Sequence, residues 1–259
     1  MKLGLMLGYS GAEMTMPVEL VQQAEALGFD SVWTAEAYGS DATSPLAYLA
    51  AVTKRIRLGT SIMQLAARTP AMAAMQAATI DALAGGDRFI AGLGVSGPQI
   101  VEGWYGQPWG KPYYRIRDYV TIMKKIFARE EGLTHDGKEI SLPYQGEGAM
   151  GIGKPLKSIL HMNPKIPIWL GTGSESNVKL TAEIADGWFP LAFVPGMMAQ
   201  TDVGVQHVQN AVNAAAIGAL PETRIHLEHI VNIFEGAAGP RFGDHDGNGN
   251  RTSDDQFRQ

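Results

Sequence analysis

Glycine and hydroxyl residues cluster where the predicted strands of this chain end, a pattern typical of small-molecule binding sites. The clearest case is Gly94-Val95-Ser96, which follows an apolar run of strand length at residues 89–93. Glycine has no Cβ, so its backbone N–H can approach a flat or anionic ligand, and the Ser96 hydroxyl can donate or accept a hydrogen bond. A buried turn with aromatic packing would explain this one loop equally well. The residues after the other predicted strands therefore decide between a binding loop and a buried turn.

Four further predicted strands are followed by similar residues. They cover residues 3–7, 31–34, 56–60 and 166–170. Because the carboxyl ends of parallel strands meet at one edge of a sheet, we expect these loops around one mouth. The residues expected there are Gly8, Tyr9, Ser10, Glu36, Ala37, Tyr38, Ser61 to Gln64, Gly94 to Gly97 and Gly171 to Ser174.

Repeated β/α units would position these loops. Helix starts are predicted at Pro17, at Ser44-Pro45 and at Thr69-Pro70, each after a predicted strand. Such repetition indicates a parallel barrel or a doubly wound sheet. The length of 259 residues, the even spacing of the units and the lack of a GxGxxG motif after the first strand favour a TIM (β/α)8-type barrel.

Composition excludes several classes of protein. With 45% hydrophobic and 18% charged residues, the chain can bury a full core. Its net charge of -5 and the lack of a Lys/Arg cluster argue against nucleic acid and membrane surfaces as partners. The absence of cysteine excludes thiolate metal sites, and no other metal-ligand pattern is convincing, so we expect no metal. We expect a soluble cytoplasmic protein with a small-molecule substrate, and a homodimer stays possible.

A family resemblance is carried by three stretches: DSVWTAEAYGSDA at 30–42, the segment 55–112 that contains GTSIMQLAARTP and RFIAGLGVSGP, and IPIWLGTG with SNVKLTAEIADGW at 166–188. They resemble the luciferase-like superfamily of flavin-type oxidoreductases, in the branch that uses the deazaflavin coenzyme F420. The resemblance implies a TIM barrel that transfers a hydride between F420 and an organic substrate. An FMN-dependent monooxygenase that uses O2, and a non-catalytic coenzyme-binding barrel, stay open as alternatives.

The resemblance also implies which residues bind the coenzyme. It places a non-proline cis peptide at Ser61-Ile62, after the third strand. Residues Ser61, Ile62 and Gln64 would contact the ring, with Gly94, Val95 and Ser96 beside it. The coenzyme phosphate would lie at Gly171, Thr172, Gly173 and Ser174, before a helix start whose backbone N–H groups suit an anion.

Glu36 is the predicted catalytic acid or base. Many relatives carry an Asp-His pair after the second strand, whereas this chain has Glu36-Ala37, so the carboxylate is kept and the imidazole is lost. The alternative is that Glu36 only caps or pairs structurally. Tyr9, Tyr38 and Trp104 are expected to wall the substrate pocket, with core packing as the alternative.

The C-terminal part departs from the family pattern. We predict a barrel domain over residues 1–235, with 131–155 as an insertion or flap, and a polar, disordered tail over 236–259. A short strand at 187–193 would be the sixth and a strand at 224–234 the seventh, and no eighth is found. The barrel is therefore expected to be truncated or altered at its C-terminal strands.

Overall fold

The computed structural model describes residues 2–161 and 163–190, together with Gln206, Gln209, Asn210, Asn213, Ile217 and Ala219. The chain divides into two units, Met1–Leu191 and Ala192–Gln259, and the fold below is that of the first. The predicted strand at 224–234, the predicted domain boundary at 235 and the predicted tail at 236–259 lie outside the described residues.

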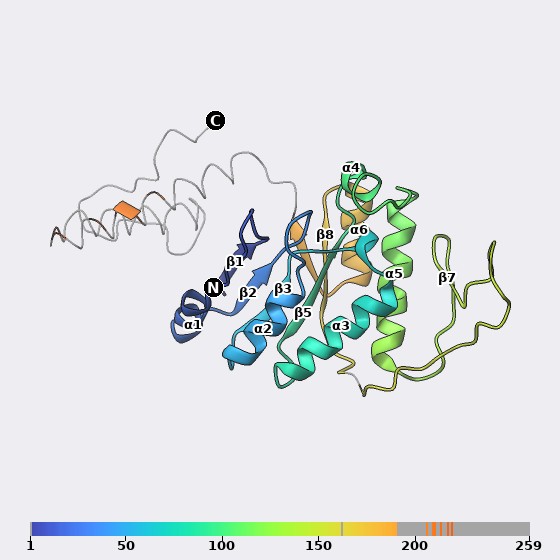
Figure 1. Cartoon of the computed structure of the whole chain (residues 1–259), viewed down its shortest axis with the longest axis horizontal. Coiled ribbons are helices and arrows are strands. Elements are labelled where there is room, and N and C mark those ends of the chain that lie inside the picture. Colours follow the sequence, from blue (N-terminus) through green and yellow to red (C-terminus); the bar gives the residue numbers. More distant parts are fainter. Residues whose placement is uncertain are drawn as a thin grey trace. The chain divides into compact units, whose positions relative to one another are not determined.

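A curled, parallel, seven-stranded sheet forms the centre of this unit (Figure 1). Its strands follow the order β1-β2-β3-β5-β8-β9, and β4 also pairs with β5. The bounds are β1 (Gly4–Gly8), β2 (Ser31–Thr34), β3 (Arg57–Thr60), β4 (Met63–Gln64), β5 (Phe89–Gly94), β8 (Ile168–Thr172) and β9 (Gly187–Pro190). The TIM-barrel type of fold is confirmed, and within the described residues the sheet is open between β1 and β9.

Helices cover the outer face of the sheet. They are α1 (Val18–Ala26), α2 (Ser44–Val52), α3 (Pro70–Leu83), α5 (Pro112–Ala128) and α6 (Glu175–Ile184). The short helix α4 (Pro98–Val101) lies in the loop after β5, and η1 (Leu65–Ala67) is a 3-10 turn. Proline in the first turn of α2 and α3 agrees with the predicted starts. Outward side chains such as Leu58 and Leu93 are fully buried in one core with Leu46 of α2 and Tyr119 of α5. None of the described helices is both long and apolar enough to cross a membrane.

Three aromatic side chains pack on the inner face of the sheet. The ring of Trp33 lies 5.3 Å from that of Trp169 and 5.1 Å from that of Phe189, centroid to centroid. In a flat sheet, β2 and β8 are three strand spacings apart, roughly 14 Å, so these contacts require the curl. Space for Trp33 comes from Gly59, where a Cβ would lie 2.2 Å from the indole ring.

The predicted insertion forms a short antiparallel hairpin of β6 (His135–Asp136) and β7 (Ser141–Leu142). Asp118 of α5 anchors it, because its carboxylate accepts hydrogen bonds from the backbone N–H of Glu139 at 2.7 Å and of Ile140 at 3.0 Å. His135 Nε2 lies 3.1 Å from the same carboxylate. The hairpin thus packs against α5 (Figure 1), and its role as a flap stays a prediction.

Candidate active site

The loops after β1 and β2 are joined at the carboxyl edge of the sheet. Ser10 N donates to Ser40 Oγ at 2.9 Å, and Ser40 N donates to Ser10 Oγ at 3.1 Å. Gly39 allows this approach, since a Cβ there would lie 2.6 Å from the carbonyl oxygen of Ser10. Two of the predicted loops therefore form one continuous rim.

The Ser61–Ile62 peptide bond is cis, as predicted. The bulge that it forms leads into β4, where Gln64 pairs with Gly94 of β5. The Ile62 side chain lies over Gly94, because a Cβ on Gly94 would be 2.9 Å from both Cγ1 and Cδ1 of Ile62. The third-strand bulge and the glycine loop after β5 are thus brought into direct contact.

Glu36 is buried and accepts hydrogen bonds at both carboxylate oxygens. Oε1 accepts from Gln64 N and from Arg68 Nη1, both at 2.7 Å. Oε2 accepts from Ala42 N at 3.0 Å and from Arg68 Nη2 at 2.7 Å. Four donors favour the structural alternative for this side chain, and its role as a catalytic acid or base stays a prediction.

Arg68 is the residue of this site that sequence reasoning missed. It lies 32 positions beyond Glu36, outside any local motif, and only a search for the partner of a buried carboxylate would have found it. Burial lowers the pKa of Arg68, but its hydrogen bonds to Glu36 outweigh this effect and raise the pKa above the ordinary value. The guanidinium therefore keeps its charge.

Gln64 lies inside the wall of the site, with 1% of its surface exposed. Its Nε2 donates to the carbonyl oxygen of Glu36 at 2.9 Å and lies 3.5 Å from that of Ala37. Among the described residues its Oε1 has no hydrogen-bond partner. The side chain holds the loop after β2, and its contact with the ring stays a prediction.

Tyr9, Tyr38 and Trp104 form a continuous aromatic series at the rim. The ring centroids of Tyr9 and Tyr38 are 6.3 Å apart, and those of Tyr38 and Trp104 are 6.5 Å apart. The side chains are 47%, 63% and 63% exposed, so within the described residues they are not core residues. The structure brings together three aromatics from three segments, and their contact with a substrate stays a prediction.

The loop between β8 and α6 contains the predicted phosphate residues. Thr172 is buried, and its hydroxyl lies 2.8 Å from that of Thr181 in α6. Gly173 and Ser174 are exposed, and Ser174 caps the helix by accepting a hydrogen bond from Asn177 N at 3.4 Å. Only the second half of this loop is therefore open to a ligand in the described structure.

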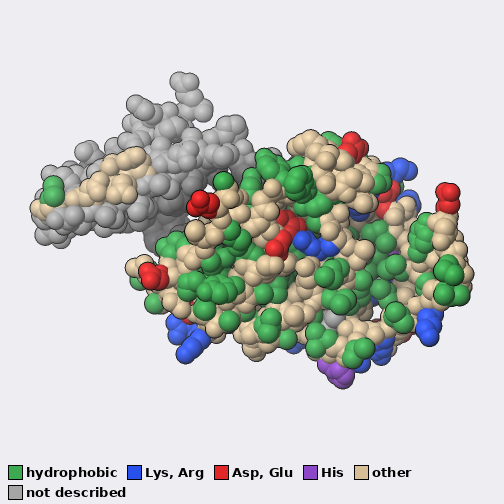
Figure 2. Space-filling view, in the orientation of Figure 1, with side chains coloured by type: hydrophobic (Ala, Val, Ile, Leu, Met, Phe, Trp, Pro, Cys, Tyr) green, Lys and Arg blue, Asp and Glu red, His purple; other side chains and the backbone are tan. Residues whose placement is uncertain are grey.

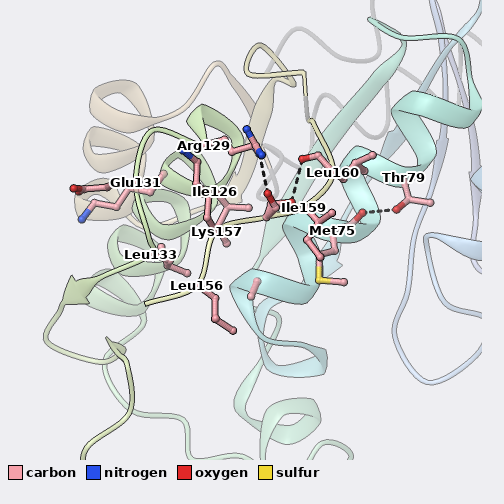
Figure 3. A pocket seen from close by; sticks show the side chains of 13 residues that line it. Met75, Thr79, Ile126, Arg129, Glu131, Leu133, Leu156, Lys157, Ile159 and Leu160 are labelled. Carbon is pink, nitrogen blue, oxygen red and sulfur yellow. Dashed lines mark hydrogen bonds between the residues drawn. The ribbon is translucent and has the colours of Figure 1, made fainter. Parts of the chain in front are cut away.

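A groove of about 470 Å³ lies elsewhere, between α3, α5 and residues 156–160 (Figure 3). No strand residue lines it, so it is not at the edge where a parallel sheet binds ligands. Each of its three cations donates to a backbone carbonyl: Lys125 to Thr134, Arg129 to Ser158 and Lys157 to Glu130. These cations hold neighbouring segments in place, and we do not assign the active site to this groove.

Exposed apolar side chains also gather over α2 and α3 (Figure 2). They include Tyr48 on α2 and Met72, Met75 and Leu83 on α3, each about half exposed. Strand ends do not contribute to this surface, so it too lies apart from the rim.

Comparison with known proteins agrees with this geometry. Residues 2–222 match the sequence profile of the family described as luciferase-like monooxygenase. The chain belongs to this family. Among its relatives, a Mycobacterium tuberculosis protein named as a coenzyme F420-dependent oxidoreductase is 54% identical over 199 residues, which are 76% of this chain and 57% of that protein.

A second relative is the 5,10-methylenetetrahydromethanopterin reductase of Archaeoglobus fulgidus. It is 31% identical over 169 residues, which cover 64% of this chain and 46% of that enzyme. The chain therefore spans about half the length of the curated relatives that it matches. The structure of a coenzyme F420-dependent tetrahydromethanopterin reductase from Methanopyrus kandleri superposes with a TM-score of 0.60 at 22% identity, covering 89% of this chain and 62% of that one, which supports the fold.

Proposed function

We propose that this luciferase-like protein is an F420-dependent oxidoreductase that transfers a hydride between the deazaflavin and an organic substrate. The observation that carries the proposal is the contact of Ile62 with Gly94, which brings the bulge after β3 against the glycine loop after β5. The resemblance implies that these two segments lie beside the coenzyme ring. The name of the Mycobacterium tuberculosis relative supports the same coenzyme.

The residues at the rim fit a flat ring with an anionic tail. Gly94 has no Cβ, so Ile62, which is partly exposed, lies directly on it and would face the ring. Ser61 and Ser96, both partly exposed, would supply hydroxyl groups beside the ring. Gly173 and Ser174 would hold the phosphate at the N-terminus of α6. When bound, the deazaflavin supplies the hydride chemistry, and the protein supplies binding and orientation.

The other rim residues would orient the substrate. Tyr9, Tyr38 and Trp104 would wall the pocket on the side of β1 and β2, because their rings form one exposed series there. Tyr105 would brace this wall, since its hydroxyl donates to the carbonyl of Ala37 at 3.2 Å and burial raises its pKa. Glu36 stays the candidate proton donor or acceptor, although its contacts suit a supporting role better.

The competing function is an FMN-dependent monooxygenase, and the family description names a monooxygenase. Fluorescence titration of the purified full chain with the deazaflavin and with FMN separates the two. We expect the deazaflavin to bind at least about tenfold more tightly than FMN, a difference of about 1.4 kcal/mol. Tighter FMN binding, or purification with FMN bound, would contradict the proposal. Binding of neither coenzyme would contradict the proposal and both alternatives, and binding of the deazaflavin without turnover of any substrate would favour the non-catalytic coenzyme-binding barrel.

A further inference from the structure

Arg68 and Glu36 form a buried ion pair with fixed geometry. Their side chains are 10% and 3% exposed, and each of two guanidinium nitrogens lies 2.7 Å from one carboxylate oxygen. A planar guanidinium that meets both oxygens determines the orientation of the carboxylate as well as its position. The pair is therefore a rigid connection between the loop after β2 and the segment before α3.

The backbone of Arg68 is itself held by two helices. Tyr119 of α5 donates its hydroxyl to the carbonyl oxygen of Arg68 at 3.1 Å. The next residue, Thr69, caps α3 by accepting a hydrogen bond from Met72 N at 3.2 Å. The guanidinium consequently projects from a fixed point on the helical layer toward the rim.

Glu36, held by Arg68, in turn holds the backbone of two segments, one at Gln64 and one at Ala42. Its Oε1 accepts the N–H of Gln64, and its Oε2 accepts the N–H of Ala42. Without Arg68, the buried carboxylate would have no counter-ion, which is strongly unfavourable. It would move toward solvent and release the N–H groups that it now accepts.

Gln64 connects the ion pair to the segment Ser61–Gln64, which we call the wall because it is expected to lie beside the coenzyme ring. It lies two residues beyond the cis Ser61–Ile62 bond and pairs with Gly94 of β5. Since Ile62 rests on Gly94, a displaced Gln64 backbone would also shift Ile62. The position of Ile62 against Gly94 thus depends on the hydrogen bond between Glu36 and Gln64.

We propose that Arg68 is a positioning residue, which acts through Glu36 to hold the Ser61–Gln64 wall at the distance that the coenzyme ring requires. The proposal rests on the proposed function only for the identity of the ligand. The hydrogen bonds that join Arg68 to Glu36, and Glu36 to Gln64 N, are independent of it.

The test compares Arg68→Ala with Arg117→Ala in the full chain. Arg117 makes the same two-pronged contact with Glu183, at 2.8 and 2.7 Å, but these side chains are 37% and 57% exposed. Two quantities are measured: the Kd for the deazaflavin, and the hydrogen-exchange rate of backbone amides in residues 61–68. We expect Arg68→Ala to raise the Kd about tenfold or more and to speed exchange in 61–68. Arg117→Ala should change neither by more than about twofold.

Rescue distinguishes positioning from general loss of structure. Millimolar guanidinium ion, added to Arg68→Ala, should restore slow exchange in 61–68 and part of the affinity, whereas sodium at equal ionic strength should not. Arg68→Lys keeps the charge without the two-pronged geometry and should be intermediate. If Arg68→Ala does not fold, Arg68→Lys carries the same two measurements.

Two results would overturn the proposal: unchanged exchange in 61–68, or faster exchange with an unchanged Kd. If the wild-type chain binds no deazaflavin, the proposed function fails on its own. Exchange and its rescue by guanidinium then decide whether Arg68 holds the wall, since both are measured without ligand.

Discussion

The two ends of the parallel sheet hold buried charges in different ways. At the amino-terminal end, Arg88 donates to the backbone carbonyls of Thr53, Ile56 and Ala84, at 2.9 to 3.2 Å. At the carboxyl end, Arg68 donates to another side chain, Glu36. Arg88 also donates to the Thr53 hydroxyl at 2.6 Å. One buried arginine is thus held mainly by backbone carbonyls, and the other by a carboxylate.

Acidic residues at the amino-terminal end also bind backbone groups, whereas Glu36 at the carboxyl end pairs with Arg68. At the amino-terminal end, Glu25 Oε1 accepts three consecutive backbone N–H groups, those of Lys54, Arg55 and Ile56. Asp81 accepts those of Arg88 and Phe89, each at 3.0 Å. These contacts join successive β/α units. Barrels commonly use the amino-terminal face for stability and the carboxyl face for chemistry, and the contacts here have that arrangement.

The largest expected effect is on the free energy of unfolding, and it concerns the amino-terminal end of the sheet. Arg88→Met should lower the free energy of unfolding by about 3 kcal/mol or more, because three buried carbonyls lose their donors at about 1 to 3 kcal/mol each. Denaturant unfolding measures it. Arg55→Met, at an exposed position in the same region, should stay within about 0.5 kcal/mol. Coenzyme affinity of folded Arg88→Met should be unchanged, and a large rise in Kd would break the contrast.

An intermediate effect is expected at the carboxyl end. Gly94→Ala places a Cβ 2.9 Å from the end of the Ile62 side chain, so Ile62 has to move away from Gly94. Because Ile62 is partly exposed, it can swing into the mouth, so we expect a roughly tenfold weaker Kd for the deazaflavin. The melting temperature should change little. Gly11→Ala, with nothing within 4 Å of its Cβ, is the control, and equal affinity of both variants would refute the expectation.

The smallest expected effect concerns pH. Burial raises the pKa of Glu25, but the N–H groups of Ile56, Arg55 and Lys54 outweigh it and bring the pKa below the ordinary value. A lowered pKa stabilises the fold above the ordinary glutamate pKa, and this contribution is lost as the pH falls through the folded-state value. Glu25→Gln should therefore be less stable than wild type near pH 7, by no more than about 1 kcal/mol, with a smaller difference near about pH 3.

Unfolding experiments at both pH values provide the measurement. The exposed residue Glu102 offers a matched control, since Glu102→Gln should show no such pH dependence. A difference for Glu25→Gln that stays constant with pH would mean that the charge of Glu25 contributes nothing to this end of the sheet.

Local sequence signals were sufficient for the elements and for the position of the site. Apolar runs bounded by glycine and proline predicted the strands at 31–34 and 89–93 to within one residue of β2 and β5. Proline opens α5 at Pro112, in the same way as it opens α2 and α3. The gathering of the loops at one edge followed from the parallel order of the strands, and the cis bond at Ser61–Ile62 followed from family resemblance.

What the sequence determined by itself is therefore local: which segments are strands and helices, and which loops follow each strand, because backbone preferences act over a few residues. Tertiary structure alone decided the partners of buried groups. Glu36 meets Arg68 across 32 positions, and Trp33 meets Trp169 and Phe189 across the curl of the sheet. These contacts depend on strand register and on the angle between strands, which determine where side chains distant in sequence come together.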